Sequence, residues 1–129
     1  MKNSSSDRDS AGHYSDRELA FAYLKTNQYD KALEHALLEY NRRPNNIDVN
    51  ETVAWVYYSK GEYNKALPYA KTALATNSKN PVLLCRMGLV YFKNADKTTA
   101  AALLKSALQA NPNINTELRK QSEAAVASL

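Results

Sequence analysis

Hydrophobic and small side chains recur along this chain with two spacings, one of helical turns and one of 34 residues. Within six segments, apolar residues recur three or four positions apart, as they do along one face of an α-helix. One tyrosine position recurs at 34-residue intervals in Tyr23, Tyr57 and Tyr91. Small residues keep the same interval in two further series: Ala20, Ala54, Gly88 and Ala32, Ala66, Ala100. This period predicts a stack of similar helical units, each burying its apolar face against its neighbours.

The pattern divides the chain into a polar tail, three repeats and a last helix. We expect a flexible tail at 1–12, repeats at 13–46, 47–80 and 81–114, and a capping helix at 115–129 that covers the last pair's open face. Each repeat contains a turn near its middle: Asn27-Gln28, Lys60-Gly61-Glu62 and Asn94-Ala95-Asp96. Asn80 before Pro81 is the clearest helix start. The expected fold is all-α, with three antiparallel helix pairs.

Particular residues within this period resemble the tetratricopeptide repeat. They are Ala54, Tyr57, Gly61, Tyr63, Ala66, Ala73 and Leu74 in the second repeat, and Gly88, Tyr91, Ala100, Ala107, Leu108 and Pro112 in the third. The resemblance covers residues 13–114. The resemblance is weaker in the first repeat, where Glu39 and Tyr40 occupy the positions equivalent to Ala73 and Leu74. It is also weaker at the end of the second repeat, where Ser78 replaces the usual proline.

The resemblance implies an α-α superhelix, a right-handed solenoid whose first helices line a concave groove for peptides or partner helices. The chain also resembles segments of longer bacterial repeat proteins, so we expect it to be a segment of such a protein. We therefore expect a cytoplasmic location if the chain is complete, and leave the compartment open if a signal has been removed.

Composition and charge narrow the classes of partner and chemistry. The 129 residues carry a net charge of +4, but basic and acidic residues are interspersed along the chain, which is typical of solvated helix faces and not of nucleic-acid binding. Repeats that bind RNA run at 35 residues and need polar code positions, so RNA ranks below protein as a partner. The apolar stretches are too short for a membrane span.

The first helix of each repeat presents an arc opposite its small residues, at about 100 degrees per residue. The predicted peptide-binding residues lie on or beside this arc: Arg17, Phe21, Leu24, Lys25, Glu51, Trp55, Tyr58, Arg86, Leu89, Phe92 and Lys93. Ser59 and Cys85 also lie on the arc but are not predicted to bind the peptide. An apolar, aromatic strip of this kind indicates a partner site. We expect Phe21, Trp55, Tyr58 and Phe92 to anchor the partner and the four basic residues to orient it.

Two other interpretations of the strip remain open. Its large side chains could fill the space between adjacent repeats, or the groove could be occupied by the chain's own tail, a neighbouring molecule or the rest of a longer parent. The leading hypothesis is a non-enzymatic scaffold that binds another protein or peptide. The alternative is a structural or self-assembly module, including a homo-oligomer formed through the groove.

Some members of the family bind a partner's C-terminal carboxylate with a clamp of two lysines, two asparagines and an arginine. Arg17 and Arg86 match basic positions of that clamp, but Phe21 and Thr52 replace asparagines and Val82 replaces a lysine. We therefore reject the clamp as the leading hypothesis. The basic residues of the arc could still favour an acidic peptide.

The sequence shows no constellation of catalytic residues and no set of metal ligands, so we expect neither an enzyme nor a cofactor. Cys85 is the single cysteine, and a small apolar filler is a better interpretation than a reactive thiol. We expect His35 to be solvated on the outer surface of a second helix. Pro68 lies about one turn into a helix, where we expect a slight kink.

Overall fold

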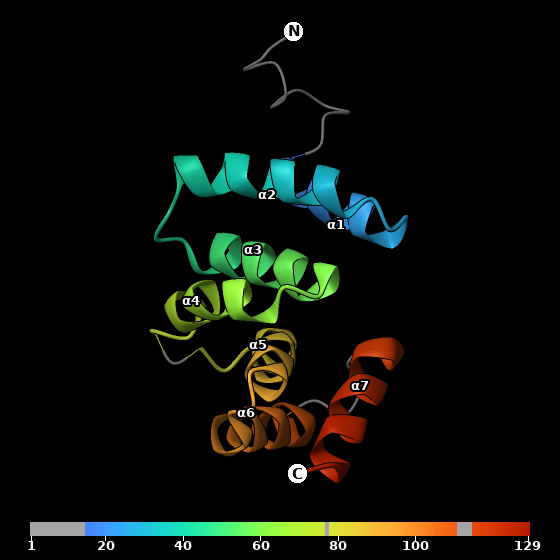
Figure 1. Cartoon of the computed structure of the whole chain (residues 1–129). Coiled ribbons are helices and arrows are strands. Elements are labelled where there is room, and N and C mark those ends of the chain that lie inside the picture. Colours follow the sequence, from blue (N-terminus) through green and yellow to red (C-terminus); the bar gives the residue numbers. More distant parts are fainter. Residues whose placement is uncertain (1–14, 77, 111–114) are drawn as a thin grey trace, which may run out of the picture.

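The computed structural model describes residues 15–76, 78–110 and 115–129. The predicted tail at 1–12 and the turn around Pro112 lie outside these ranges. The described residues form helices and no strand. The helices are α1 (Asp16–Lys25), α2 (Tyr29–Arg42), α3 (Ile47–Lys60), α4 (Tyr63–Ala73), α5 (Pro81–Lys93), α6 (Lys97–Ala110) and α7 (Thr116–Ala127). Figure 1 shows them stacked in sequence order as an all-α superhelix.

Polar caps explain where several helices begin. The Ser15 hydroxyl accepts from the Glu18 amide, and Glu18 returns a bond to the Ser15 amide, which forms a capping box before α1. Asn46, Asn80 and Asn115 accept backbone N–H groups at the starts of α3, α5 and α7. The start predicted at Asn80 and Pro81 is confirmed.

Each helix packs against the next as an antiparallel pair, and successive pairs stack on one another. The pairs are α1 with α2, α3 with α4, and α5 with α6, while α3 and α5 also contact the first helix of the preceding pair. The turns between paired helices contain Asn27, Gly61 and Ala95, which all have positive φ angles. These three positions are 34 residues apart, so one turn geometry is repeated three times.

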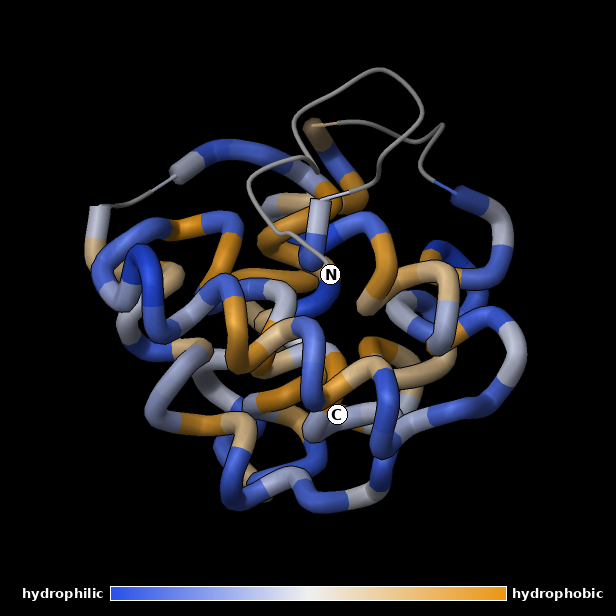
Figure 2. Tube along the Cα trace, turned by 90° about the horizontal axis from the view of Figure 1, so that it is seen from above, coloured by the Kyte–Doolittle hydropathy of each residue, from blue (hydrophilic) through white to orange (hydrophobic). Residues whose placement is uncertain are grey.

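Small residues allow the paired helices to approach closely. Ala20, Ala54, Ala32, Ala66 and Ala100 are all 0% exposed, as the period predicted. Viewed from above, hydrophobic residues gather towards the inside of the stack and hydrophilic ones dominate its periphery (Figure 2). The two series of small residues therefore lie in the buried cores between paired helices.

The last helix, α7, packs on α5 and α6 in the way that α5 packs on α3 and α4. Its residues Leu118, Ser122 and Ala125 are buried, as predicted. Thus α7 occupies the position that a first helix of a further repeat would take. The repeat boundaries at 13–46, 47–80 and 81–114 stay a prediction, as does a kink at Pro68, which lies inside α4.

Candidate functional site

A cavity of about 570 Å³ lies where α1, α3, α5 and α7 converge, and we call it the inner cavity. Five residues of the predicted strip line it: Phe21, Leu24, Lys25, Trp55 and Arg86. Its other lining residues are Asn27, Ser59, Val82, Asn115, Glu117, Leu118 and Gln121. The first helices of all three pairs therefore contribute to one hollow, together with α7.

The 34-residue period explains why side chains distant in sequence meet here. Phe21 and Trp55 occupy equivalent positions on α1 and α3, as do Lys25 and Ser59. Because successive pairs repeat the same packing, equivalent residues fall in columns across the inner side of the stack. The column of Phe21 and Trp55 thus contributes the apolar floor of the inner cavity, and the neighbouring column of Lys25 and Ser59 contributes its polar rim.

Arg86 is the central cation of the inner cavity. Its guanidinium lies 4.7 Å from the ring centre of Phe21 and 5.7 Å from that of Trp55. Arg86 Nη1 also donates to Glu51 Oε2 at 2.7 Å. Cation–π contacts on two rings and an ion pair therefore fix the orientation of this side chain.

Arg17 reaches the same acidic group from α1. Its Nη2 lies 3.7 Å from Glu51 Oε1, and its Nε donates to the Thr52 hydroxyl at 3.0 Å. The Thr52 hydroxyl in turn donates to the Asp48 carbonyl at 2.7 Å. Arg17 also lies 5.1 Å from the Phe21 ring centre. Two arginines and one carboxylate thus link α1, α3 and α5.

Aromatic stacking continues along α3 from the inner cavity. Trp55 and Tyr58 are parallel with ring centres 4.5 Å apart, and Tyr58 meets Tyr63 edge-on at 5.4 Å. Burial, aided by the nearby Tyr63, raises the pKa of Tyr58 to about 12. Its neutral hydroxyl donates to Gln121 Oε1 of α7 at 3.3 Å.

Beyond this bond lies a second hollow of about 240 Å³, the lower cavity. It is lined by Tyr58, Leu89, Phe92 and Lys93 on one side and by Gln121, Ala124, Ala125 and Ser128 of α7 on the other. Lys93 Nζ lies 5.6 Å from the ring centre of Tyr63 and 6.0 Å from that of Phe92. Gln121 lines both cavities, so its bond to Tyr58 marks the boundary between them.

Two members of the predicted strip are not exposed. Glu51 is only 4% exposed because Arg17 and Arg86 lie against it, and Leu89 is 2% exposed because it packs in the core beside α7. The exposure expected for Glu51 on this arc is therefore wrong, whereas the burial of Leu89 agrees with the alternative that large side chains of the strip serve packing. Helical phase placed them on the correct side of α3 and α5 but could not reveal what covers them.

Cys85 is fully buried, in agreement with its interpretation as an apolar filler. Burial raises the pKa of its thiol, although a hydrogen bond with Ser122 of α7 opposes that shift. A raised pKa disfavours the reactive thiolate.

The prediction of a solvated His35 is wrong. His35 Nδ1 lies 2.8 Å from Asp16 Oδ1, and its ring stacks on Tyr23 with centres 5.5 Å apart. Asp16 is 3% exposed and also bonds to Arg42. His35 therefore belongs to a network that joins α1 to α2.

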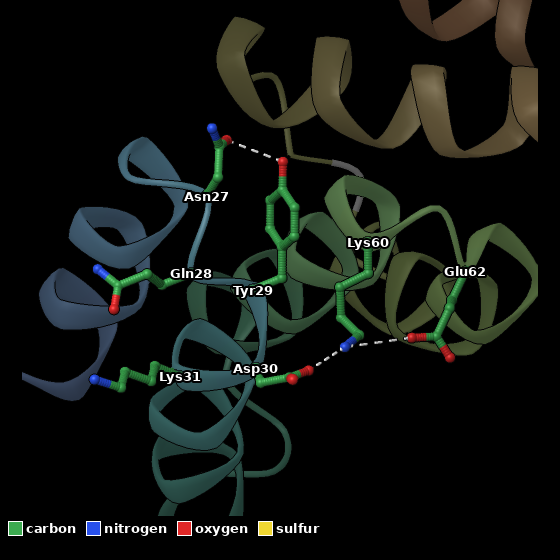
Figure 3. Close-up of a pocket in the computed structure, with 7 residues that line it drawn as sticks. All are labelled: Asn27, Gln28, Tyr29, Asp30, Lys31, Lys60 and Glu62. Atoms are coloured by element: carbon green, nitrogen blue, oxygen red, sulfur yellow. Dashed lines mark hydrogen bonds and ion pairs between the residues drawn. The ribbon is translucent and has the colours of Figure 1, made fainter.

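Sequence reasoning missed the contribution of α7 to both cavities. The face formed by Leu118, Ser122 and Ala125 predicts a helix that packs on the last pair, but not that other residues of the same helix line the cavities. A side cavity of about 620 Å³ was missed as well (Figure 3). There Lys60 Nζ bonds to Asp30 Oδ1 at 2.6 Å and lies 3.7 Å from Glu62 Oε2, so the cavity lies beside an ion-paired link between repeats.

Two further observations concern metal ions and membranes. In residues 15–76, 78–110 and 115–129, no three His, Cys, Asp or Glu side chains are grouped as a metal site would require. None of the helices in that same portion of the chain has the length and apolar character needed to cross a membrane.

Comparison with known sequences identifies one repeat family in part of the chain. Residues 82–114 match the family model described as Tetratricopeptide repeat. No curated protein sequence matches the chain. The span matched by the family model lies within the predicted third repeat.

Solved structures of tetratricopeptide-repeat domains superpose on most of the chain. The Sgt2 domain from Aspergillus fumigatus has a TM-score of 0.73 at 20% identity, covering 96% of this chain and 80% of its own. The first domain of human RPAP3 has a TM-score of 0.67 at 26% identity, covering 88% and 91%. The first domain of Spaghetti (RPAP3), bound to the HSP90 peptide SRMEEVD, has a TM-score of 0.70 at 20% identity, covering 88% and 89%. These likenesses establish the fold.

Proposed function

We propose that this chain, a tetratricopeptide-repeat protein, is a non-enzymatic scaffold that binds a peptide or helical segment of another protein in its inner cavity. The observation that carries the proposal is the cavity itself. It measures about 570 Å³ and combines apolar side chains from α1, α3, α5 and α7 with polar groups at its rim. Sites for ligands typically have this combination of apolar walls and a few polar groups.

Half-buried aromatic rings supply the anchors. Phe21 and Trp55 lie in the inner cavity, and Tyr58 and Phe92 lie in the lower cavity. Such rings lose little conformational entropy on binding and present a large area, so they are frequent hot spots of protein interfaces. A bound segment would contact the first pair in the inner cavity and continue towards Phe92.

Charges at the two ends would orient the segment. Lys25 in the inner cavity makes no ion pair or hydrogen bond with any residue that the structure describes. Within the same part of the chain, the ammonium group of Lys93 in the lower cavity contacts the rings of Tyr63 and Phe92 and makes no ion pair. Arg17 and Arg86 are engaged with Glu51, so their role is in positioning the cavity wall. One structural neighbour is bound to the acidic heptapeptide SRMEEVD, which makes that peptide a suitable first probe.

The test is capture of partners from a cell lysate by the full chain, with Trp55→Ala as the groove variant. A specific partner should lose about 2 kcal/mol of binding free energy, roughly 30-fold in Kd, when this anchor is removed. Tyr69→Ala is the matched control, because Tyr69 also loses aromatic contacts, with Tyr40 and Tyr57, but lines neither cavity.

Circular dichroism would establish that both variants are folded. Equal retention of every partner by wild type and Trp55→Ala would contradict the proposal. Light scattering would test the alternative of self-assembly, because a groove filled by a second copy would give dimers that dissociate on dilution.

A further inference from the structure

Glu51 is a buried carboxylate directly behind the wall of the inner cavity, where it pairs with the lining residue Arg86. It is 4% exposed, and each of its oxygens faces a different arginine. Oε2 accepts from Arg86 Nη1 at 2.7 Å, while Oε1 lies 3.7 Å from Arg17 Nη2. A buried carboxylate needs compensation of this kind, because it has lost its hydration.

The position of Glu51 in the repeat makes it distinctive. Counting by 34 residues, Glu51 on α3 is equivalent to Arg17 on α1 and to Cys85 on α5. The first repeat thus has a cation, Arg17, in this column, and the second repeat has an anion, Glu51. Because the two repeats are adjacent, the cation of one meets the anion of the other.

In this arrangement, N–H groups of Arg17 and Arg86 that could bind a ligand are already bonded to, or face, Glu51 and Thr52. An arginine holds a carboxylate most strongly through two parallel N–H bonds. One end of the Arg86 fork donates to Glu51, and its guanidinium carbon lies over the Phe21 ring. The Nε of Arg17 donates to Thr52, and its Nη2 faces Glu51. A ligand carboxylate placed between them would also approach the negative charge of Glu51.

We infer that Glu51 determines the charge preference of the groove, acting as an internal carboxylate that keeps Arg17 and Arg86 from binding an acidic group of the partner. The inference rests on the proposed function and adds the class of partner. The central part of the bound segment is apolar or neutral and contacts Phe21 and Trp55. Acidic residues are accepted only at its ends, near Lys25 and Lys93. Like-charge repulsion from Glu51 excludes them from the middle.

The test measures Kd by fluorescence polarisation for two labelled peptides on the full chain. One is the acidic heptapeptide named above, and the other is its neutral analogue, with glutamine in place of the arginine and both glutamates, asparagine in place of the aspartate and an amidated C-terminus; both peptides carry the label on the N-terminal amine. Wild type should bind the neutral analogue at least as tightly as the acidic peptide. Glu51→Gln should bind the acidic peptide about tenfold more tightly than wild type does, because both arginines gain free charge.

Two controls separate this gain from a general change in charge. Glu62→Gln changes the net charge equally but lies beside Lys60 and Lys65, outside both groove cavities, and it should reproduce none of the gain. Glu51→Gln combined with Arg86→Met should lose most of the gain, since the cation that Glu51 held would be absent.

The inference is overturned if folded Glu51→Gln shows no gain over wild type, or if wild type binds the acidic peptide tenfold more tightly than the neutral one. If Glu51→Gln does not fold, the ratio of the wild-type Kd values for the acidic and neutral peptides decides the question alone. Either contradiction leaves peptide binding itself intact. Failure of the proposed function would instead appear as equal partner retention by wild type and Trp55→Ala.

Discussion

Gly88 of α5 lies so close to Leu104 of α6 that a Cβ atom at residue 88 would stand 2.8 Å from both Cγ and Cδ2 of Leu104. It would also stand 3.2 Å from Leu103 Cβ. The equivalent residues Ala20 and Ala54 carry a Cβ and are fully buried. The third pair therefore uses the absence of a side chain to bring its two helices together.

Gly88→Ala should destabilise the protein by about 1 kcal/mol. Overpacking costs about 1–3 kcal/mol, and the better helix propensity of alanine returns up to about 1 kcal/mol. Urea denaturation followed by circular dichroism would measure the change. In a Leu104→Ala background the same substitution should cost much less or stabilise, because the two closest atoms are gone and the contact with Leu103 Cβ at 3.2 Å remains. A cost that persists undiminished in that background would contradict the steric explanation.

The turns between paired helices should respond oppositely to glycine and alanine. Gly61 has φ of 84°, and a Cβ atom at this residue would have no other atom within 4 Å, so Gly61→Ala meets only backbone strain. That strain is about 1–2 kcal/mol for an L-residue in the left-handed region. Ala95 has φ of 66° in the equivalent turn, so Ala95→Gly should stabilise by up to about 1 kcal/mol, less the entropy that glycine adds to the unfolded chain. Paired urea midpoints would test both signs, and a loss of stability in Ala95→Gly would refute the argument.

The sequence was sufficient to predict the helices and their pairing, because local signals and the 34-residue period agree. Asn80 and Pro81 mark the start of α5, and Gly61 ends α3 in the left-handed conformation that glycine favours. Helical phase also placed Phe21 and Trp55 on the side of the stack where the inner cavity lies. These features depend on residues within one repeat or on strict repetition between repeats.

The remainder of the site depends on contacts that no period contains. Glu51 and Arg86 occupy different columns of the repeat, and their ion pair requires the actual stagger between α3 and α5. The position of α7 required knowing on which side of α5 the chain returns, and this decided the burial of Leu89. Pattern arguments identify a helix face, whereas the neighbour that covers it is a property of the assembled stack.

Asp16 should make stability depend on pH in the acid range. Burial raises the pKa of its carboxyl, but hydrogen bonds from Arg42 and His35 and their charges outweigh burial, so the net pKa is below the ordinary 3.8. A depressed pKa in the folded state gives stability that is complete above the unfolded value and is lost as pH falls through the folded value. Asp16→Asn should therefore cost about 1–2 kcal/mol at pH 7 and flatten the decline of stability below about pH 4.

Urea denaturation at pH 7, 4 and 3 would measure this dependence. Asp30→Asn is the control, since Asp30 also has a lowered pKa, through the hydrogen bond from Lys60, but its carboxylate is 94% exposed. Solvent screening should leave that variant with a much smaller effect. Equal responses of the two variants would remove Asp16 from the explanation of acid sensitivity.

The ion pair between Arg86 and Glu51 should appear as a large coupling energy in a double-mutant cycle. Arg86→Met leaves Glu51 buried, and Arg17 at 3.7 Å is then its one remaining ion-pair partner among the described residues. An uncompensated buried charge costs about 3–5 kcal/mol. Glu51→Gln should cost less, because Arg86 retains partial exposure and its contacts with Phe21 and Trp55. The double variant has no buried carboxylate left unpaired, so it should be more stable than Arg86→Met alone.

We expect a coupling energy of about 1–3 kcal/mol from urea denaturation of the four proteins. Additive losses would mean that Arg17 alone compensates Glu51, and the central cation of the cavity wall would then be held chiefly by its aromatic neighbours.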